Sequence, residues 1–317
     1  MNQQHCGLPS CPICAMKIGL ARQKRVESMI ESWSEKSECH DMAFITSTMP
    51  HNIGQSLETN QNQFMNARRR MKRQLRLKKT SEFVPYSEII EMFGIIHTIT
   101  KIEVTVGKNG WHYHSHEIYF TAWRWTDKEL ASFKFLMVEA WKRALIAEKV
   151  VIANDQAFFK RSIDAERVSD SKNISKYISK TTGWDVTYEL TRDDLKKGGL
   201  GSRSMIQVLG DYTMGKDKAK NARYYKEWAE TMHGKQQFFL SRGSSEMLNL
   251  DEFVEFDETE DVELSELLGV IENRNWDIIR RKNLRGEVLE SCIKYGFDAT
   301  MNLLEDIDRK EMISKIK

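Results

Sequence analysis

Three histidines stand at alternate positions in one short stretch of the chain. The sequence GWHYHSHEIYF begins at Gly110 and contains His112, His114 and His116, although the whole chain has only 8 histidines. Side chains at every second position of a β-strand project from the same face. Imidazoles grouped in this way are typical ligands of a divalent metal ion that acts as a Lewis acid. The alternative is that they form the polar face of a surface strand.

The residues before the histidines predict a partner strand that adds a carboxylate. Residues 95–106 (IIHTITKIEVTV) are rich in β-branched side chains, and Asn109-Gly110 is a strong hairpin-turn signal. A two-residue turn places Glu103 opposite either His114 or His116, depending on which two residues form it. In both registers the carboxylate joins the histidine face, whereas a three-residue loop would put the next residue, a valine, there.

A tyrosine flanked by lysines forms a second candidate site. In the segment DSKNISKYISK (170–180), Tyr177 follows Lys176 directly, and Lys180 comes three residues later. The composition predicts a short helix, on which positions i and i+3 are neighbours, so Tyr177 and Lys180 can approach the same phosphate. A nearby ammonium favours the phenolate, the nucleophilic form of tyrosine. The alternative is an ordinary amphipathic helix face.

Three of the 5 cysteines lie close together near the start of the chain. Cys6, Cys11 and Cys14 predict a structural zinc site, which needs four nitrogen or sulfur ligands. The alternative is a loop at the start of a helix that binds no metal. The candidates for the fourth ligand are Cys39, His5 and His40.

Charge is unevenly distributed along the chain, although its net charge is only +2. Residues 68–79 (RRRMKRQLRLKK) contain eight basic residues and no acid, and residues 251–266 contain nine carboxylates and no base. The basic run favours contact with nucleic-acid phosphates; the alternative is a solvated helix. The candidate DNA contacts are Arg68, Arg69, Arg70, Lys72, Arg73 and Lys176.

Several elements are predicted around these sites. Residues 42–48 alternate as a strand does, and residues 64–79 have helical composition with an apolar stripe. Residues 126–149 predict a longer helix, in which Thr126 and Glu129 can form a capping box.

These motifs resemble those of the rolling-circle plasmid replication initiators, the Rep proteins of the HUH endonuclease superfamily. FITSTMPH (44–51), GWHYHSHEIYF and KYISK (176–180) resemble the family's first motif, its metal motif and its nucleophile motif, in the same order. CPICAMKIGLAR (11–22) resembles an N-terminal CPxC segment, and residues 224–243 resemble a C-terminal motif of the family. The resemblance covers roughly residues 6–243.

The resemblance implies an α+β fold with a central antiparallel β-sheet flanked by helices. It implies an enzyme that nicks and rejoins one strand of origin DNA, single-stranded or in a hairpin, with Tyr177 as nucleophile and Lys180 stabilising phosphate charge. Some members have a carboxylate where this chain has Asn173. An amide cannot act as a general base, so we expect the second cleavage to use Tyr177 of another chain, in a homodimer at the origin.

The resemblance also implies a catalytic Mg²⁺ or Mn²⁺ ion. His114 and His116 would be its principal ligands, and the third ligand would be His112 or Glu103. Host replication helicase and polymerase would be further partners.

We expect three parts: a Cys-rich zinc-binding segment and helix (1–40), an HUH nuclease domain (41–245), and an acidic linker with a helical appendage (246–317). No apolar stretch reaches 18 residues and the N-terminus has no apolar signal region, so we expect no membrane span and a cytoplasmic location.

Three alternative functions use the same features. Two are a single-strand transposase and a mobilisation relaxase, and the third is a zinc-containing DNA-binding protein without catalysis. Because Tyr177 follows the histidines in the chain, the order favours a replication initiator over a relaxase.

Overall fold

The structure is a computed structural model that describes residues 6–36, 40–73, 83–168 and 201–244, together with part of 275–304. The chain divides into two compact units, Met1–Glu260 and Asp261–Lys317. The described part of the second unit is helical and has a small apolar core that includes Ile278, Val288 and Cys292. The division predicted at residues 40 and 245 stays a prediction.

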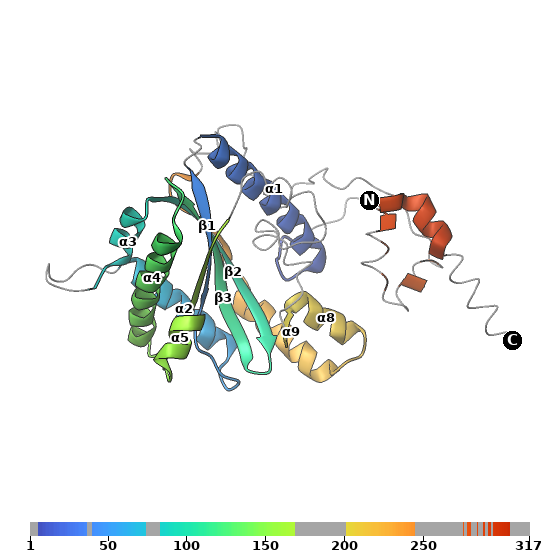
Figure 1. The fold of residues 1–317 in the computed structure, drawn as a ribbon. Coiled ribbons are helices and arrows are strands. Elements are labelled where there is room, and N and C mark those ends of the chain that lie inside the picture. The colour runs from blue at the N-terminus through green and yellow to red at the C-terminus, as the bar shows by residue number, and fades with distance from the viewer. Residues whose placement is uncertain are drawn as a thin grey trace, which may run out of the picture. The chain divides into compact units, whose positions relative to one another are not determined.

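An antiparallel β-sheet forms the centre of the first unit (Figure 1). Its strand order is β4-β1-β3-β2-β5, and β6 also pairs with β2. This arrangement confirms the predicted α+β fold. The strands are β1 (Asp41–Thr48), β2 (Ile95–Gly107), β3 (Gly110–Thr121), β4 (Ile163–Arg167), β5 (Ser202–Ser204) and β6 (Phe238–Leu240).

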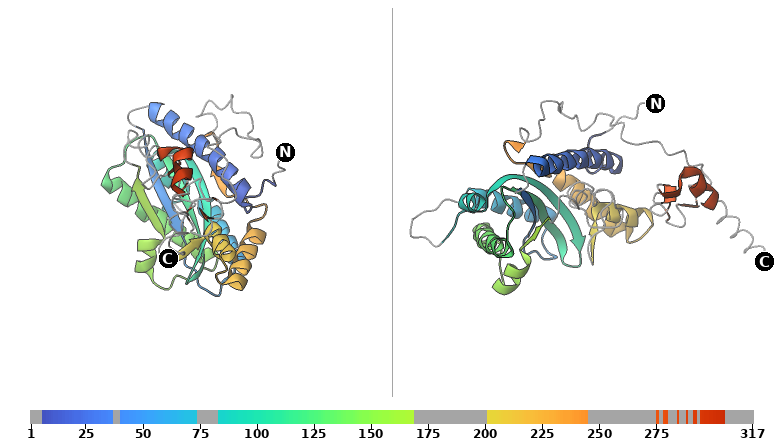
Figure 2. Two further views of the ribbon diagram at one scale, coloured as in Figure 1. Left: turned by 90° about the vertical axis from the view of Figure 1, so that its right-hand side faces the viewer. Right: turned by 45° about the horizontal axis from the view of Figure 1, so that its top comes forward.

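Helices cover both faces of this sheet (Figure 2). On one face, α1 (Pro12–Lys36) packs through Val26, Met29, Ile30 and Trp33 against apolar side chains of β1, β2 and β3. The other described helices contribute to a larger core on the opposite face. They are α2 (Leu57–Lys72), α3 (Tyr86–Met92), α4 (Asp127–Ala147), α5 (Asp155–Arg161), α8 (Met205–Thr213) and α9 (Lys218–Met232).

Local capping determines where two of these helices begin. The predicted capping box is present in α4, where the Thr126 side chain accepts from the Glu129 amide and the Glu129 side chain accepts from the Thr126 amide. In α2 the Ser56 side chain accepts from the Thr59 amide, so the helix begins before the predicted residue 64. None of the described helices has the length and apolar character that crossing a membrane requires.

A buried ion pair joins α2 to the central strand β3. The Arg68 guanidinium donates to the two carboxylate oxygens of Glu117 at 2.6 and 3.0 Å, and to the Thr100 hydroxyl at 2.6 Å. Burial alone would raise the pKa of Glu117, but the charge and hydrogen bonds of Arg68 hold it below its usual value. Arg68 is only 7% exposed. Its charge is paired inside the protein, and the predicted contact of Arg68 with DNA stays a prediction.

Removing only the positive partner of this pair should strongly destabilise the first unit. Arg68→Met leaves the Glu117 carboxylate buried without a counter-charge, which we expect to cost about 3–5 kcal/mol in urea unfolding. The double variant Arg68→Met/Glu117→Leu should lose much less, and Arg69→Met, an exposed neighbour, should change little. Equal losses in the single and double variants would contradict this role.

The same pair should make stability depend on pH in one direction. The pKa of Glu117 in the folded protein is below its value in the unfolded chain. The stabilisation is therefore present above the unfolded pKa of about 4.3 and is lost as the pH falls through the folded pKa. As the pH falls below about 4, the free energy of unfolding of the wild type should decrease relative to that of the double variant.

Candidate metal centre

The predicted histidine strand and its hairpin partner form a cluster of three candidate ligands. The Glu103 carboxylate lies 3.1 Å from His116 Nε2 and 3.5 Å from His114 Nε2. One ligand atom from each of the three residues lies within 4.8 Å of the others. Two imidazoles and one carboxylate, nearly buried and converging, fit a divalent metal ion with coordination positions left for a phosphate oxygen.

The hairpin turn determines which histidine faces Glu103. Gly107 pairs with Gly110, so the two turn residues are Lys108 and Asn109, and Glu103 pairs with His114. Of the two registers that the sequence left open, the structure has this one. Gly110 has a φ of 89°, and a Cβ at this position would meet the Ile53 Cα at 2.9 Å. Both the backbone conformation and the space therefore favour glycine there.

Two side chains of β1 orient His116. Thr46 pairs with His116 across the sheet, and its hydroxyl oxygen lies 3.0 Å from His116 Nδ1. The Phe44 ring stacks on the imidazole with a centroid separation of 5.5 Å. When Nδ1 donates its hydrogen to Thr46, Nε2 keeps the lone pair that ligates a metal. Sequence analysis missed Thr46, because its place depends on the register between two distant strands.

His112 lies beside the cluster rather than in it. Its ring stacks on His114 with centroids 4.4 Å apart, and the centroid of the His51 ring is 5.1 Å away. Desolvation, followed by the charges of His114 and His51, lowers the pKa of His112 to about 3, so this imidazole is neutral at physiological pH. Between the two predicted candidates for the third ligand, the geometry favours Glu103.

Lys101 is a second residue near the cluster that sequence analysis missed. It pairs with His116 on one side and with Phe238 of β6 on the other, and it lies on the same sheet face as Glu103. Its side chain is only 1% exposed. A buried lysine therefore lies next to His116 in the sheet, on the same face as the cluster.

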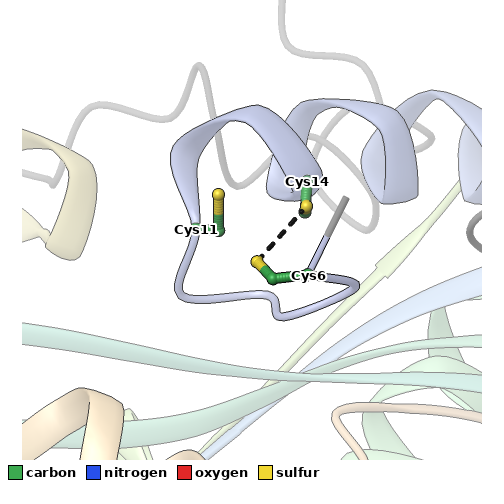
Figure 3. A group of neighbouring side chains, drawn as sticks. All are labelled: Cys6, Cys11 and Cys14. Atoms are coloured by element: carbon green, nitrogen blue, oxygen red, sulfur yellow. Dashed lines mark hydrogen bonds between the residues drawn. The ribbon is translucent and has the colours of Figure 1, made fainter. Parts of the chain in front are cut away.

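The three N-terminal cysteines also come together, immediately before and within the first turn of α1 (Figure 3). The sulfur atoms of Cys6 and Cys14 are 3.6 Å apart, with Cys11 completing the group. A backbone hydrogen bond at Leu8 lowers the pKa of Cys6, but the Cys14 thiol, desolvation and Cys11 raise it above its usual value. Three crowded thiols suit a cation such as zinc, which binds them as thiolates.

The described residues add no fourth ligand to this cluster. His40 stacks on Trp33, near the other end of α1, with ring centroids 4.0 Å apart. Because the 25 residues of α1 span about 37 Å, His40 cannot reach the cysteines. The other two candidates, Cys39 and His5, lie outside the described residues.

The exposed basic residues of α2 lie on the face of the sheet opposite the histidines, since α2 packs into the other core. Arg70 donates to Glu148 at 2.8 Å, and Lys72 lies 5.9 Å from the Tyr86 ring. Arg69 and Arg73 are also at the surface. The predicted residues of the nucleophile segment lie outside the described residues: Asn173, Lys176, Tyr177 and Lys180.

The fold and the cluster define a class: an α+β protein whose central hairpin presents two histidines and a carboxylate on one face of an antiparallel sheet. A family model described as a replication protein, Rep_1, matches residues 1–272. The chain therefore belongs to this family, the rolling-circle Rep proteins of plasmids. Membership implies binding to origin DNA and a part in initiating plasmid replication. No curated protein and no solved structure matches the chain.

The cysteine cluster should hold a structural zinc ion. We expect purified protein to contain about one equivalent of zinc by elemental analysis, and Cys11→Ser to lose it with a lower melting temperature. Cys292→Ala, in the second unit, should keep the zinc. A wild-type protein without zinc, or a Cys11→Ser variant that retains it, would count against the site.

The Thr46 hydroxyl should tune the affinity of the histidine cluster for Mn²⁺. Thr46→Val removes the acceptor for His116 Nδ1 at nearly constant volume, and we expect Mn²⁺ binding about tenfold weaker by calorimetry. Thr46→Ser should restore the affinity. Thr48→Val is the matched control, because the Thr48 hydroxyl donates to the Arg161 carbonyl instead. Unchanged Mn²⁺ affinity in Thr46→Val would refute the assignment.

Proposed function

We propose that the chain starts rolling-circle replication by nicking one strand of its plasmid origin and later rejoining it. The observation that carries this proposal is the cluster of Glu103, His114 and His116 in a chain that belongs to the Rep family. Two imidazoles and a carboxylate are suited to hold Mg²⁺ or Mn²⁺ against a phosphate oxygen.

The proposed nucleophile is Tyr177, on the basis of the KYISK motif. Its phenolate oxygen attacks the scissile phosphorus, the bond from phosphorus to the 3′ oxygen breaks, and this oxygen takes up a proton. The 5′ phosphate stays on Tyr177, while the free 3′ hydroxyl primes synthesis by the host polymerase, with a host helicase unwinding the duplex. Rejoining is the reverse reaction, in which a 3′ hydroxyl displaces Tyr177 from the phosphate.

The remaining residues prepare the phosphate for attack. A divalent ion in the cluster would supply Lewis-acid polarisation of the scissile phosphate. The Thr46 hydroxyl, 3.0 Å from His116 Nδ1, would accept the proton of that nitrogen and leave the Nε2 lone pair directed at the cluster. The ammonium groups of Lys101 and Lys180 would stabilise the negative charge that develops on the phosphate oxygens.

This function predicts a covalent protein–DNA adduct. Wild-type protein with Mn²⁺ and a supercoiled plasmid carrying its own origin should give one mapped nick and an adduct on Tyr177. Tyr177→Phe and His116→Ala should give neither, although both should bind the DNA. Chelation should stop nicking and added Mn²⁺ should restore it. Tyr212→Phe, an exposed tyrosine of α8, is the matched control and should nick normally.

The results would also separate the alternative functions. DNA binding without any adduct would favour the zinc-containing DNA-binding protein, and an adduct mapped to another tyrosine would refute the role of Tyr177. Transfer of the cleaved strand into unrelated DNA would favour a transposase.

We further propose that the second cleavage uses Tyr177 of another chain, because Asn173 cannot activate water. Protein loaded covalently on one oligonucleotide should cleave a second origin strand only after fresh protein is added. Fresh Tyr177→Phe protein should not support this cleavage. Equal cleavage by the monomeric adduct alone would mean that a carboxylate activates water, and the dimer would not be needed.

A further inference from the structure

We propose that the single strand next to the nick runs through a basic groove between α1 and β6. This inference rests on the proposed nicking function and specifies the path of its substrate. The groove has a volume of about 750 Å³ and is lined by Arg22 and Arg25 of α1 and by Lys235 and Arg242 on either side of β6. No acidic side chain is among the described residues that line it.

The groove leads toward the metal cluster. A small adjoining cavity of about 40 Å³ shares Pro9, Arg22 and Gln237 with the groove, and Glu103 is also part of its lining. This cavity lies at the edge of β2, between the segment that pairs with β6 and the segment that pairs with β5. The groove and the cluster therefore adjoin the same edge of β2, so that a strand bound in the groove would lie close to the cluster.

In the described part of the chain, the groove is a basic surface on the sheet face that carries the histidines. The histidines share their face with Ile118 and Phe120, against which α1 packs. The basic residues of α2 lie on the opposite face and cannot contact a phosphate beside the cluster without the strand passing around the sheet edge. Position, rather than the number of charges, favours the groove as the path of the DNA.

The walls of the groove suit a phosphate backbone. The Arg22 guanidinium lies over the Phe238 ring, 5.4 Å from its centroid, which fixes one side chain against β6. Gly234 and Gly243 lie at its rim with φ values of 65° and 80°, so the backbone there has no Cβ to keep a strand away. Gly7 and Pro9, beside the cysteine cluster, form part of the opposite wall.

The volume favours a single strand over a duplex. It falls within the range of about 300–1,000 Å³ that is typical of pockets for one small ligand. A space of this size accommodates a few nucleotides of one strand, but a double helix is too wide for it. Basic grooves of this kind neutralise successive phosphates without reading sequence. The proposed ligand is therefore the phosphate backbone of single-stranded DNA.

The test measures binding without cleavage. A fluorescent dT20 oligonucleotide, which lacks the origin, is titrated with full-length protein in the absence of added divalent ions, and fluorescence anisotropy is followed at several salt concentrations. Lys235→Gln/Arg242→Gln should bind about tenfold more weakly at moderate salt. Its salt slope should be shallower by about 1.4, at about 0.7 for each lost single-strand phosphate contact.

The control variant Lys128→Gln/Lys149→Gln removes two exposed charges outside the groove, and it should bind like the wild type. Melting temperature and zinc content should be unchanged in both variants. Wild-type affinity and salt slope in the groove variant would overturn the proposal, as would equal weakening in the control variant. Loss of duplex binding with intact dT20 binding would show that the groove does not hold a single strand.

The outcome is separable from that of the nicking assay. If wild-type protein gives no nick or adduct at its origin, the proposed function fails. Selective loss of dT20 binding in the groove variant would still identify the groove as a DNA site. If wild-type protein nicks but the groove variant binds dT20 normally, the path is wrong and the function stands.

Discussion

The buried pair of Arg68 and Glu117 holds the histidine strand β3 in its register. Glu117 follows His116 directly, so their side chains project from opposite faces of β3. On the sheet face opposite the histidines, Arg68 of α2 donates to Glu117 of β3 and to Thr100 of β2. These hydrogen bonds connect α2 to both strands of the hairpin. A slip of one residue would exchange the faces and bring the histidines into the α2 core. Such a slip would separate the buried Glu117 carboxylate from the Arg68 guanidinium and is therefore costly.

The histidine hairpin was predictable because its signals are local. Alternating His114 and His116, together with β-branched residues before a turn, specify two strands and one shared face without reference to the rest of the chain. The composition also placed Glu103 on that face. It could not select the register, because Asn109-Gly110 is compatible with two turns. The structure has the turn at Lys108-Asn109, with the positive φ on Gly110.

Other features depend on packing between distant segments, and the sequence does not reveal these. Arg68 and Arg69 are the same residue type at adjacent positions, yet Arg68 is buried and Arg69 is exposed. Their difference follows from the face of α2 that meets the sheet. Thr46 and Lys101 are brought next to His116 only by strand pairings across more than ten residues of chain. A run of basic residues therefore predicts positive charge, but it does not predict which of the side chains are exposed to a ligand.

Helix α1 connects three features that are separate in the sequence. Its second half is held to the sheet by apolar contacts of Val26, Met29 and Trp33. Its first half lines the cavity next to Glu103 and, through Arg22, the basic groove. The cysteines lie just before and within its first turn, and the Tyr225 hydroxyl donates to the Ser10 carbonyl in the same loop. An ion bound by the cysteines would therefore stabilise the wall of the groove, whereas an ion bound by Glu103, His114 and His116 would act on the proposed substrate phosphate.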